Sequence, residues 1–439
     1  MNHPITNPDK VFQYACKNGL LDTAQQMFLN KPTIDISAGN EEAFRISCGH
    51  GHLEVAKWLL EVKPTIDISA KNEEAFSWAC SSGHLHVAQW LLRINPTIMN
   101  SVYYEYTFRL VCYYRHLNVA QWLLEVKPTI DISSKNENVF RYACRNGHLN
   151  VAQWLLQIKP TIDISANSEE AFRWACFYGH LDVVKWLLFV KPTINISAEN
   201  EFAFKWACSN GHLDVAKWLL QIKPTINISA DNEYAFRWAC VHGYLNVVQW
   251  LVQNKSTIDI SANNEFAFKW ACSNGHLDVA KWLLQMKPTI DISAENEYAF
   301  GGACYNGYLN VAQWLLQIKP TIDISANNEF AFKEACDNGH LNIAQWIVSL
   351  RPDKYNVTLN NDGTISYKII KPLNIVGTKN VSQKETCPIC CVSDCDIITC
   401  CEHSYCTQCI SNWLNTNHSS CPTCRNNIGN NAFRKLSVM

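Results

Sequence analysis

The chain has 439 residues, of which 48% are hydrophobic and 17% charged, and this composition is typical of folded protein. A formal net charge of -2 excludes a global attraction to nucleic acid or to an anionic membrane. No apolar run approaches the roughly 20 residues of a membrane-spanning helix, and the opening MNHPITNPDK shows no secretory signal. We therefore expect an intracellular, cytoplasmic protein whose 21 cysteines stay reduced.

An internal repeat of 32 residues organises most of the chain. A PTIDISA-like segment recurs with proline at positions 32, 64, 96, 128, 160, 192, 224, 288, 320 and 352, and Ser256 fills the one remaining place. One unit, residues 40–71, reads NEEAFRISCGHGHLEVAKWLLEVKPTIDISAK. Its apolar residues recur at helical spacing and predict two short helices, which are separated by Gly51 and ended by Pro64. About eleven such helix pairs fit into residues 1–352.

The start of each unit carries polar signals. Asn40 is placed to cap the first helix, and Glu41 to interact with its positive end. Arg45 follows Glu41 by four residues, which predicts an ion pair on a solvated helix face. The same spacing recurs along a basic column that comprises Arg45, Arg109, Arg141, Arg173, Lys205, Arg237, Lys269 and Lys333.

Three further columns are interpreted as packing residues. One cysteine per unit, from Cys16 every 32 residues to Cys336, lies mostly beside alanine on an apolar face, which favours a core residue over a metal or redox site. The histidine after the glycine, as in His52, is replaced by Tyr244 and Tyr308 without a change of pattern, so its role is expected to be structural. The tryptophan column, from position 58 to position 346, is also expected to pack.

One column changes character along the repeats. It is acidic or mixed in the first units and then aromatic at Phe202, Tyr234, Phe266, Tyr298 and Phe330. This aromatic ridge is a candidate surface for a protein partner, and packing of the rings between adjacent helices is the alternative. The tenth unit also contains Gly301-Gly302 within a predicted helix, where we expect a bend.

The pattern A-F-x-x-A-C-x-x-G-H-L-x-V-A-x-W-L-L resembles the ankyrin repeat, whose units contain T-P-L-H-x-A-A followed by G-H and a V-x-x-L-L helix. The resemblance covers about residues 8 to 352 and implies a mostly α, helical solenoid that recruits a protein. It departs from the family where E-A-F replaces T-P-L and by one residue in the period, so the usual finger-like β-turn is not carried over. In style, these Asn- and Ile-rich arrays are similar to those of giant DNA viruses, which would act in a host cell.

The period ends near residue 352. Residues 353–386 are predicted to form a β-hairpin around the turn NNDG, followed by the polar linker GTKNVSQKET. Ten cysteines then fall between positions 387 and 424, and residues 426–439 form a C-terminal tail.

Eight side chains in this segment have the spacing C-x2-C-x10-C-x-H-x2-C-x2-C-x11-C-x2-C. They are Cys387, Cys390, Cys401, His403, Cys406, Cys409, Cys421 and Cys424. Both thiolates of a C-x2-C pair reach one tetrahedral zinc ion from a tight turn, so four pairs predict two sites. Cys400 is an alternative to Cys401, while Cys391 and Cys395 are surplus thiols.

This order and spacing resemble the C3HC4 RING finger, which interleaves its ligand pairs. The resemblance implies a small α+β domain over residues 387–425 with two structural zinc ions. Cys387, Cys390, Cys406 and Cys409 would bind the first, and Cys401, His403, Cys421 and Cys424 the second. About 40 residues bury too little apolar surface to fold alone, so the metal ions must supply folding energy.

The resemblance also implies a function as a RING-type E3 ubiquitin ligase. Ile389, Trp413 and Pro422 occupy the positions at which the family binds the ubiquitin-conjugating enzyme, and we expect Ile389 and Trp413 to project outward. Arg425 occupies the position of the basic residue that contacts both this enzyme and ubiquitin. The ligase would hold the charged thioester in a reactive conformation, with no covalent intermediate, while the repeat array recruits the substrate. The alternative is a non-enzymatic interaction scaffold whose RING has a structural role.

Overall fold

The computed structural model describes residues 8–370, 375–381, 386–391, 393, 395–399, 403–415, 420–423, 425 and 433–438. The chain divides into two compact units. The first comprises residues 1–239 with 246–258, and the second comprises residues 240–245 with 259–439. We describe each unit by itself.

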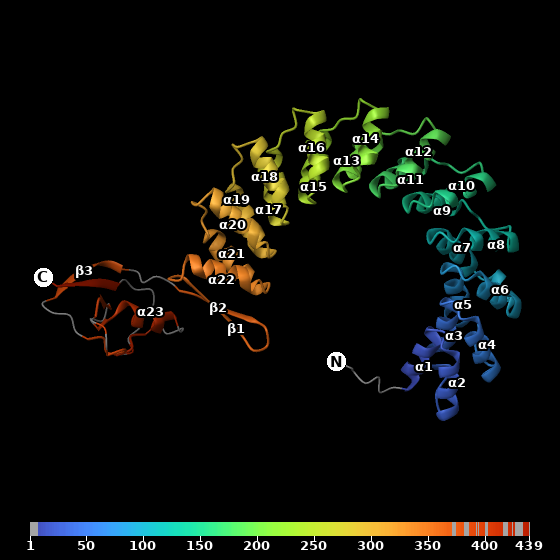
Figure 1. The fold of residues 1–439 in the computed structure, drawn as a ribbon, viewed down its shortest axis with the longest axis horizontal. Coiled ribbons are helices and arrows are strands. Elements are labelled where there is room, and N and C mark those ends of the chain that lie inside the picture. The colour runs from blue at the N-terminus through green and yellow to red at the C-terminus, as the bar shows by residue number, and fades with distance from the viewer. Residues whose placement is uncertain are drawn as a thin grey trace. The chain divides into compact units, whose positions relative to one another are not determined.

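The first unit consists of stacked helix pairs (Figure 1). The first helices of its pairs are α1 (Pro8–Lys17), α3 (Ala38–Gly49), α5 (Ala70–Ser81), α7 (Tyr103–Tyr113), α9 (Ser134–Arg145), α11 (Ala166–Phe177) and α13 (Ala198–Ser209). The second helices are α2 (Leu21–Asn30), α4 (Leu53–Val62), α6 (Leu85–Ile94), α8 (Leu117–Val126), α10 (Leu149–Ile158), α12 (Leu181–Val190), α14 (Leu213–Ile222) and α16 (Leu245–Asn254). A 3₁₀ helix, η1 (Pro96–Asn100), precedes α7, and α15 (Ala230–Val241) ends at the boundary between the units.

The second unit continues the pattern and adds the C-terminal region. Its pairs are α17 (Ala262–Ser273) with α18 (Leu277–Met286), α19 (Ala294–Tyr305) with α20 (Leu309–Ile318), and α21 (Ala326–Asp337) with α22 (Leu341–Leu350). Within each unit, the first helices pack against one another and against their own second helices. Helix α19 continues through Gly301 and Gly302, so the expected bend there is wrong.

The core of the array lies between the two helix rows. Phe44 and Cys48 of α3 and Leu59 of α4 are 0% exposed, and all eleven repeat cysteines are buried. Burial raises the pKa of the Cys16 thiol to about 12, so this thiol stays neutral and unreactive. The interpretation of this column as core is therefore confirmed.

The first helix of each pair ends at a glycine that the fold requires. Gly51 has φ 82°, and His52 N donates to Ser47 O at 2.9 Å, which closes the helix in a Schellman-type bond. A Cβ on Gly51 would lie 2.6 Å from Nδ1 of His84 in the next unit, so only glycine allows this approach. Arg115 nevertheless adopts φ 70° at the equivalent place in the fourth unit.

A left-handed turn, not an asparagine cap, opens the first helix of most pairs. In α3, Asn40 has φ 57° and Glu41 has φ 61°, and neither angle is helical. The prediction that Asn40 caps the helix is therefore wrong. The Ser37 hydroxyl instead donates to the Glu41 carboxylate at 2.7 Å. The other carboxylate oxygen of Glu41 accepts, at 3.5 Å, from Asp67 N in the segment that leads to α5, the first helix of the next pair.

The same carboxylate bond recurs between other units. Glu169, Glu201, Glu265 and Glu297 each accept from a backbone N–H twenty-six residues later, at 3.2, 3.3, 3.4 and 3.3 Å respectively. In the first three of these residues the side chain is buried. A buried carboxylate must be hydrogen-bonded to be tolerated, so each bond fixes the spacing of two units.

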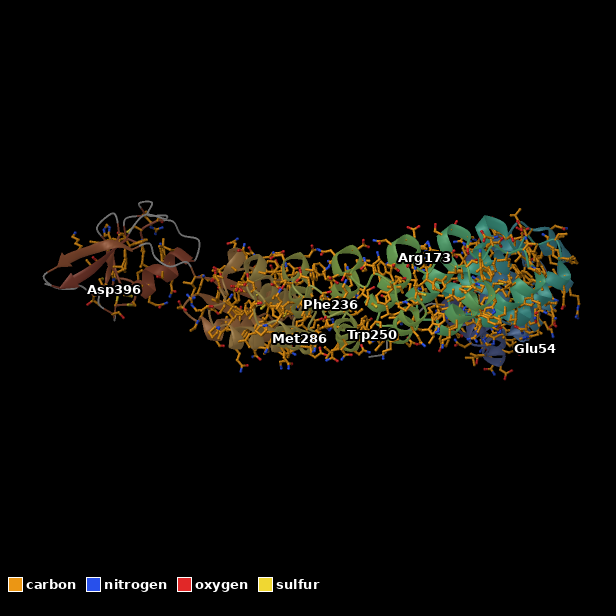
Figure 2. All side chains as sticks on the ribbon, turned by 90° about the horizontal axis from the view of Figure 1, so that it is seen from above. Glu54, Arg173, Phe236, Trp250, Met286 and Asp396 are labelled. Carbon is orange, nitrogen blue, oxygen red and sulfur yellow. The ribbon has the colours of Figure 1, made fainter. Side chains whose placement is uncertain are left out.

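The basic column is also arranged differently from our expectation. Arg45 is 2% exposed and forms its ion pair with Glu74 of the next unit, not with Glu41. Arg141 likewise pairs with Glu170. The predicted solvated pairs within one helix are wrong because the left-handed turn removes the helical spacing between the two residues. Figure 2 shows the side chains of the array, including Arg173 of this column.

A hairpin covers the last helix pair. Strands β1 (Tyr355–Leu359) and β2 (Ile365–Ile369) are antiparallel, and Tyr355 is paired with Ile369. Tyr355 is 1% exposed, and its ring centroid lies 4.4 Å from that of Phe332 in α21. Its hydroxyl donates to the Glu329 carboxylate, so a tyrosine takes the place that a further unit would occupy.

The C-terminal region combines a small sheet with one helix. The elements are β3 (Ile375–Val381), β4 (Ile397–Ile398), β5 (Ser404–Tyr405), α23 (Thr407–Asn415) and β6 (Phe433–Val438). The strand order is β3-β6-β4-β5, in which β3 and β6 are parallel and the other pairs are antiparallel. A mostly α array followed by a small α+β region is thus the observed fold class, as predicted.

The histidine column connects each unit to the one before it. His52 Nε2 lies 3.0 Å from Lys17 O, and His148 Nε2 lies 2.8 Å from Tyr113 O, so the ring N–H donates to a backbone carbonyl. Burial lowers the pKa of several of these rings below the usual histidine value: His84, His116, His148, His180, His212 and His276.

We expect these histidines to make the stability of the array depend on pH. A base whose folded pKa is lowered stabilises the protein above its unfolded pKa of about 6.5, and this stabilisation is lost as pH falls below that value. Urea unfolding of the full chain, followed by helical circular dichroism, should therefore have a lower midpoint at about pH 5.5 than at about pH 7.5. His212→Tyr, which copies Tyr244 and Tyr308, should reduce this difference. An unchanged midpoint between the two pH values would contradict the interpretation.

Candidate metal centre

Four cysteines of the C-terminal region form one compact group. Cys387 and Cys390 lie in the turn that precedes β4, Cys406 follows β5, and Cys409 lies in the first turns of α23. Their Sγ atoms all lie within 4.8 Å of one another, and Cys390 Sγ is 3.9 Å from Cys406 Sγ. Tetrahedral ligands with metal–sulfur bonds of ~2.3 Å lie ~3.8 Å apart. The four thiols therefore fit one metal ion.

The electrostatics of the group also favour a cation. Burial, and then the neighbouring thiol of Cys406, raises the pKa of the Cys409 thiol to about 12, and burial likewise raises the pKa of Cys406. Several thiolates at this spacing repel one another, and a divalent cation reverses that balance because it stabilises each thiolate directly. The group can thus bind a metal ion with release of protons.

The backbone holds the first cysteine pair in position. Cys387 N donates to Ser393 O at 2.8 Å, and Cys391 N donates to Cys387 O at 2.9 Å. Cys391 adopts φ 56° and is exposed, whereas Cys395 is 1% exposed within the hydrophobic core. The two surplus thiols therefore lie outside the group of four.

The other predicted ligands are only partly described. Cys401 and Cys424, and the alternative Cys400, lie outside the described residues. His403 Nδ1 is buried and has no hydrogen-bond partner among the residues that the structure describes. Buried nitrogens usually have a partner, so this atom is a candidate metal ligand. Cys421 is 0% exposed and lies at the edge of the same core.

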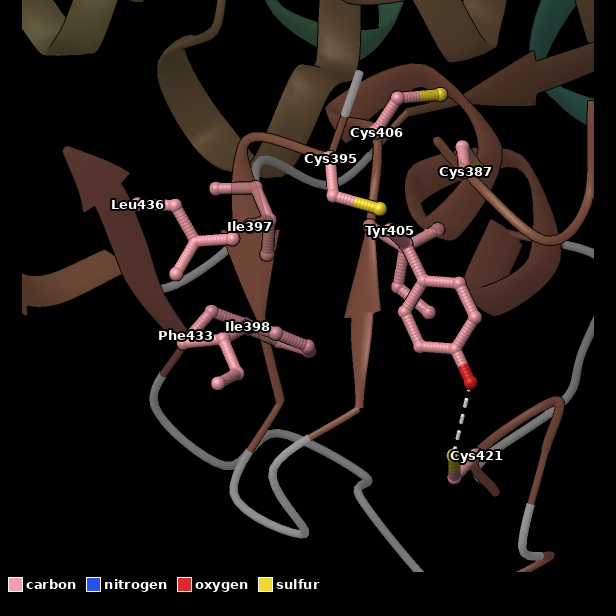
Figure 3. Packing of buried hydrophobic residues seen from close by; sticks show 10 residues of the cluster. Cys387, Cys395, Ile397, Ile398, Tyr405, Cys406, Cys421, Phe433 and Leu436 are labelled. Carbon is pink, nitrogen blue, oxygen red and sulfur yellow. Dashed lines mark hydrogen bonds between the residues drawn. The ribbon is translucent and has the colours of Figure 1, made fainter. Parts of the chain in front are cut away.

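Tyr405 is a positioning residue that the sequence analysis did not identify. Its hydroxyl lies 3.1 Å from Cys421 Sγ (Figure 3). It also lies 2.6 Å from Thr423 Oγ1 and accepts from Thr423 N at 3.2 Å. Burial and the adjacent Cys421 raise its pKa to about 12, so the hydroxyl keeps its proton and can donate to a thiolate. The tyrosine directly before Cys406 was the only available signal, and the sequence does not show that it lies near Cys421.

A small core and one carboxylate support these positions. Ile397, Ile398, Tyr405, Ile410 and Phe433 are half of the ten buried residues of this cluster, which is drawn in Figure 3.

Asp396, labelled in Figure 2, connects three elements. It accepts from Thr407 N at 2.5 Å and from Thr407 Oγ1 at 2.6 Å, while Leu436 N donates to its carbonyl at 2.9 Å. It thus caps α23, which carries Cys409.

The four residues predicted to bind partner proteins differ in exposure. Ile389 is 42% exposed in the loop between Cys387 and Cys390, and Arg425 is exposed with φ 62°. Pro422 is half-buried. Trp413 is also half-buried, packs against the core and donates its indole N–H to Ser420 O at 2.7 Å. The Trp413 side chain is therefore exposed only in part, and its polar N–H is held by a backbone acceptor.

The aromatic ridge of the array consists mainly of packed rings. Phe202 lies 5.7 Å from Trp206 on the same helix and 5.9 Å from Trp174 in the preceding unit. Tyr298 lies 5.5 Å from Trp270. Of the five ridge residues, all of which the structure describes, Phe330 alone is among the exposed large apolar side chains, at 37%.

Comparison with protein families matches the chain to the family described as ankyrin repeats (3 copies), over residues 12–101, 108–200, 172–264, 204–296 and 268–361. These matches cover more than half of the chain, so it belongs to the ankyrin repeat family. The resemblance noted from the repeat pattern is thereby confirmed, and ankyrin repeats indicate a role in binding proteins. No family match covers the cysteine-rich segment. A search of curated proteins finds no match.

Among the described residues, no helix combines the length and apolar character that a membrane crossing requires.

Proposed function

We propose that the chain is a RING-type E3 ubiquitin ligase whose ankyrin array recruits the substrate. The observation that supports this most strongly is which cysteines come together. Cys387 and Cys390 join Cys406 and Cys409, although His403 lies between the two pairs in the sequence. This is the interleaved pairing expected of the first site of a RING cross-brace, and a simple succession of sites would not produce it.

Two structural zinc ions are part of this proposal. A shell of four thiolates suits zinc and leaves no open position for a reacting water, so the ions would serve folding and not hydrolysis. Cys401, His403, Cys421 and Cys424 would bind the second ion. The buried His403 Nδ1, which has no hydrogen-bond partner in the described part of the chain, supports this assignment.

The proposed partner surface lies beside the first ion. Ile389 is held between two ligands, so its exposed side chain is presented on a rigid loop at little entropic cost. Arg425 has its backbone N–H fixed on Cys421 O at 3.0 Å, and its guanidinium would contact ubiquitin and the conjugating enzyme together. The protein would form no covalent intermediate and would hold the thioester in a reactive conformation.

The zinc assignment predicts the metal content. Elemental analysis of the purified full chain should give two zinc ions per chain. Removal of the metal with a chelator should abolish the ordered structure of the C-terminal region, while the helical signal of the array remains. Cys406→Ser should lose the first ion, whereas Cys391→Ser, which alters an exposed surplus thiol, should keep both. Wild-type protein that holds one zinc ion or none would contradict the cross-brace.

Tyr405→Phe should weaken the second zinc site alone. The change removes one hydroxyl that lies 3.1 Å from Cys421 Sγ and leaves the ring in the core. Losing such a supporting hydrogen bond typically costs about 10–100-fold in metal affinity. Competition with a chelator of known affinity should therefore remove one of the two ions at a lower chelator concentration than in wild type. Equal loss of both ions, or no change, would argue against the role assigned to Tyr405.

Ile389→Ala should abolish discharge of ubiquitin from a conjugating enzyme while both zinc ions remain bound. Loss of an apolar anchor at a small interface costs about 2 kcal/mol, which corresponds to a roughly thirtyfold weaker contact. Ile389 is a sharper probe than Trp413, whose replacement would also disturb the core. Leu359→Ala, on the hairpin, is the matched exposed control and should have no effect.

Arg425→Ala provides a contrast to Ile389→Ala, because binding of the conjugating enzyme should persist while discharge slows. Wild-type protein that discharges ubiquitin from none of a broad panel of conjugating enzymes would reject the ligase. It would leave a protein-interaction scaffold with a structural metal centre.

A further inference from the structure

Three arginines of the basic column make the same two hydrogen bonds to the backbone of the array. Arg173 donates from Nε to Ser168 O at 2.7 Å and from a terminal nitrogen to Asn167 O at 3.0 Å. Arg45 and Arg237 make the same two bonds to the residues five and six positions earlier. These carbonyls belong to the left-handed turn that opens the helix. The turn therefore presents two adjacent backbone carbonyl oxygens that can both accept from one planar guanidinium.

The next unit completes this guanidinium site with a side chain of the ridge column. The Arg173 guanidinium lies 4.9 Å from the ring centroid of Phe202, and the Lys269 ammonium lies 5.8 Å from that of Tyr298. Both are cation–π contacts between consecutive units. Three ridge rings, those of Phe202, Tyr234 and Tyr298, are thus covered by a cation from the preceding unit.

The tenth unit keeps the acceptor but lacks the cation. Gly301 stands at the place of the arginine or lysine, and Gly302 at the place of the tryptophan that follows it in the four preceding units. The left-handed turn is retained, with Glu295 at φ 56° and Asn296 at φ 53°. Glycine has no side chain, so position 301 supplies no cation to the ring of Phe330 in the next unit. The Phe330 side chain is 37% exposed.

A pocket of about 520 Å³ occupies this position, between α17, α19 and α21. Five aromatic and two acidic side chains line it: Trp270, Tyr298, Phe300, Tyr305, Phe330, Glu297 and Asp323. No lysine, arginine or histidine is among its lining residues. Asn327, also in the lining, donates to Asn296 O at 3.3 Å, so a neutral amide contacts one of the two carbonyl oxygens of the turn. The volume is in the range of ligand pockets, and the lining favours a cation.

We propose that this pocket binds the guanidinium of an arginine side chain presented by a protein partner. The partner would supply in trans the group that Arg45, Arg173 and Arg237 supply within the chain. Arginine is preferred over lysine because two adjacent carbonyls match a forked donor, and it is preferred over an apolar side chain because the rim carries Glu297 and Asp323. The inference concerns the array and does not depend on the metal centre or on ligase activity.

The test uses the full chain and short fluorescein-labelled peptides of glycine and serine with one central residue. Fluorescence anisotropy should show saturable binding of the arginine peptide that weakens with added salt. The citrulline peptide has the same shape without the charge and should bind at least about tenfold more weakly, since a charge-assisted hydrogen bond is roughly twice as strong as a neutral one. The lysine peptide should be intermediate.

Gly301→Arg should fill the site from within the chain. The new side chain can donate to the two carbonyl oxygens of the turn, as Arg173 does in its own unit. A Cβ at position 301 would lie 3.0 Å from Cδ1 of Phe330, and a slight shift of that ring accommodates it. Binding of the arginine peptide should be lost, and the melting temperature should rise because the helix no longer contains a glycine there. Phe330→Ala should weaken binding at least about tenfold through loss of the cation–π contact.

Tyr234→Ala is the matched control, since it removes a ridge ring at a place that the Lys205 ammonium already covers at 5.5 Å. Peptide binding should be unchanged in this variant. The proposal is overturned if the arginine peptide fails to bind at millimolar concentration, if citrulline or tryptophan peptides bind as well as arginine, or if Gly301→Arg binds the peptide like wild type.

Discussion

The glutamate carboxylate that opens the first helix, buried in six of the repeats, is the contact on which the array depends. Glu201 accepts from Ser197, directly before its own helix α13, and from the backbone of Asn227, in the segment that leads to α15, so one side chain fixes both the local turn and the spacing of two helix pairs. The turn places residues other than glycine at positive φ, which is unfavourable by about 1–2 kcal/mol per residue. A sequence tolerates that cost only where the hydrogen bonds of the turn and the stacked neighbour offset it.

The helix pairs were predictable, but the turn that joins them was not. Spacing of Val55, Ala56 and Leu59 predicts an amphipathic helix from local sequence alone, and Gly51 predicts its boundary. By contrast, the positive φ at Asn40 and Glu41 falls on residues other than glycine, and the favourable bond of Glu41 is made to Asp67, twenty-six residues later. Treating these residues as the start of a regular helix also led to the wrong pairing of the basic column.

In the C-terminal region, the cysteine pairs carried enough information to predict the group of four thiols. Two cysteines on one tight turn must share a neighbourhood, and the resemblance then implied which pairs meet. The supporting residues carried no such signal, because strand pairing brings Asp396 to Thr407, and Tyr405 to Cys421, from positions well separated in the sequence. Trp413 was assigned from its position alone, without the acceptor that holds its indole.

The tyrosine at the start of β1 has a consequence for how separate molecules behave. A solenoid made of near-identical units presents, at its last unit, the same apolar face that every internal unit buries against its neighbour. Tyr355 lies on Phe332 at that face, and its hydroxyl satisfies the carboxylate of Glu329, which in other units accepts from the following repeat. The hairpin thereby occupies the surface on which the first unit of another chain would stack, and it prevents head-to-tail growth of filaments from this end.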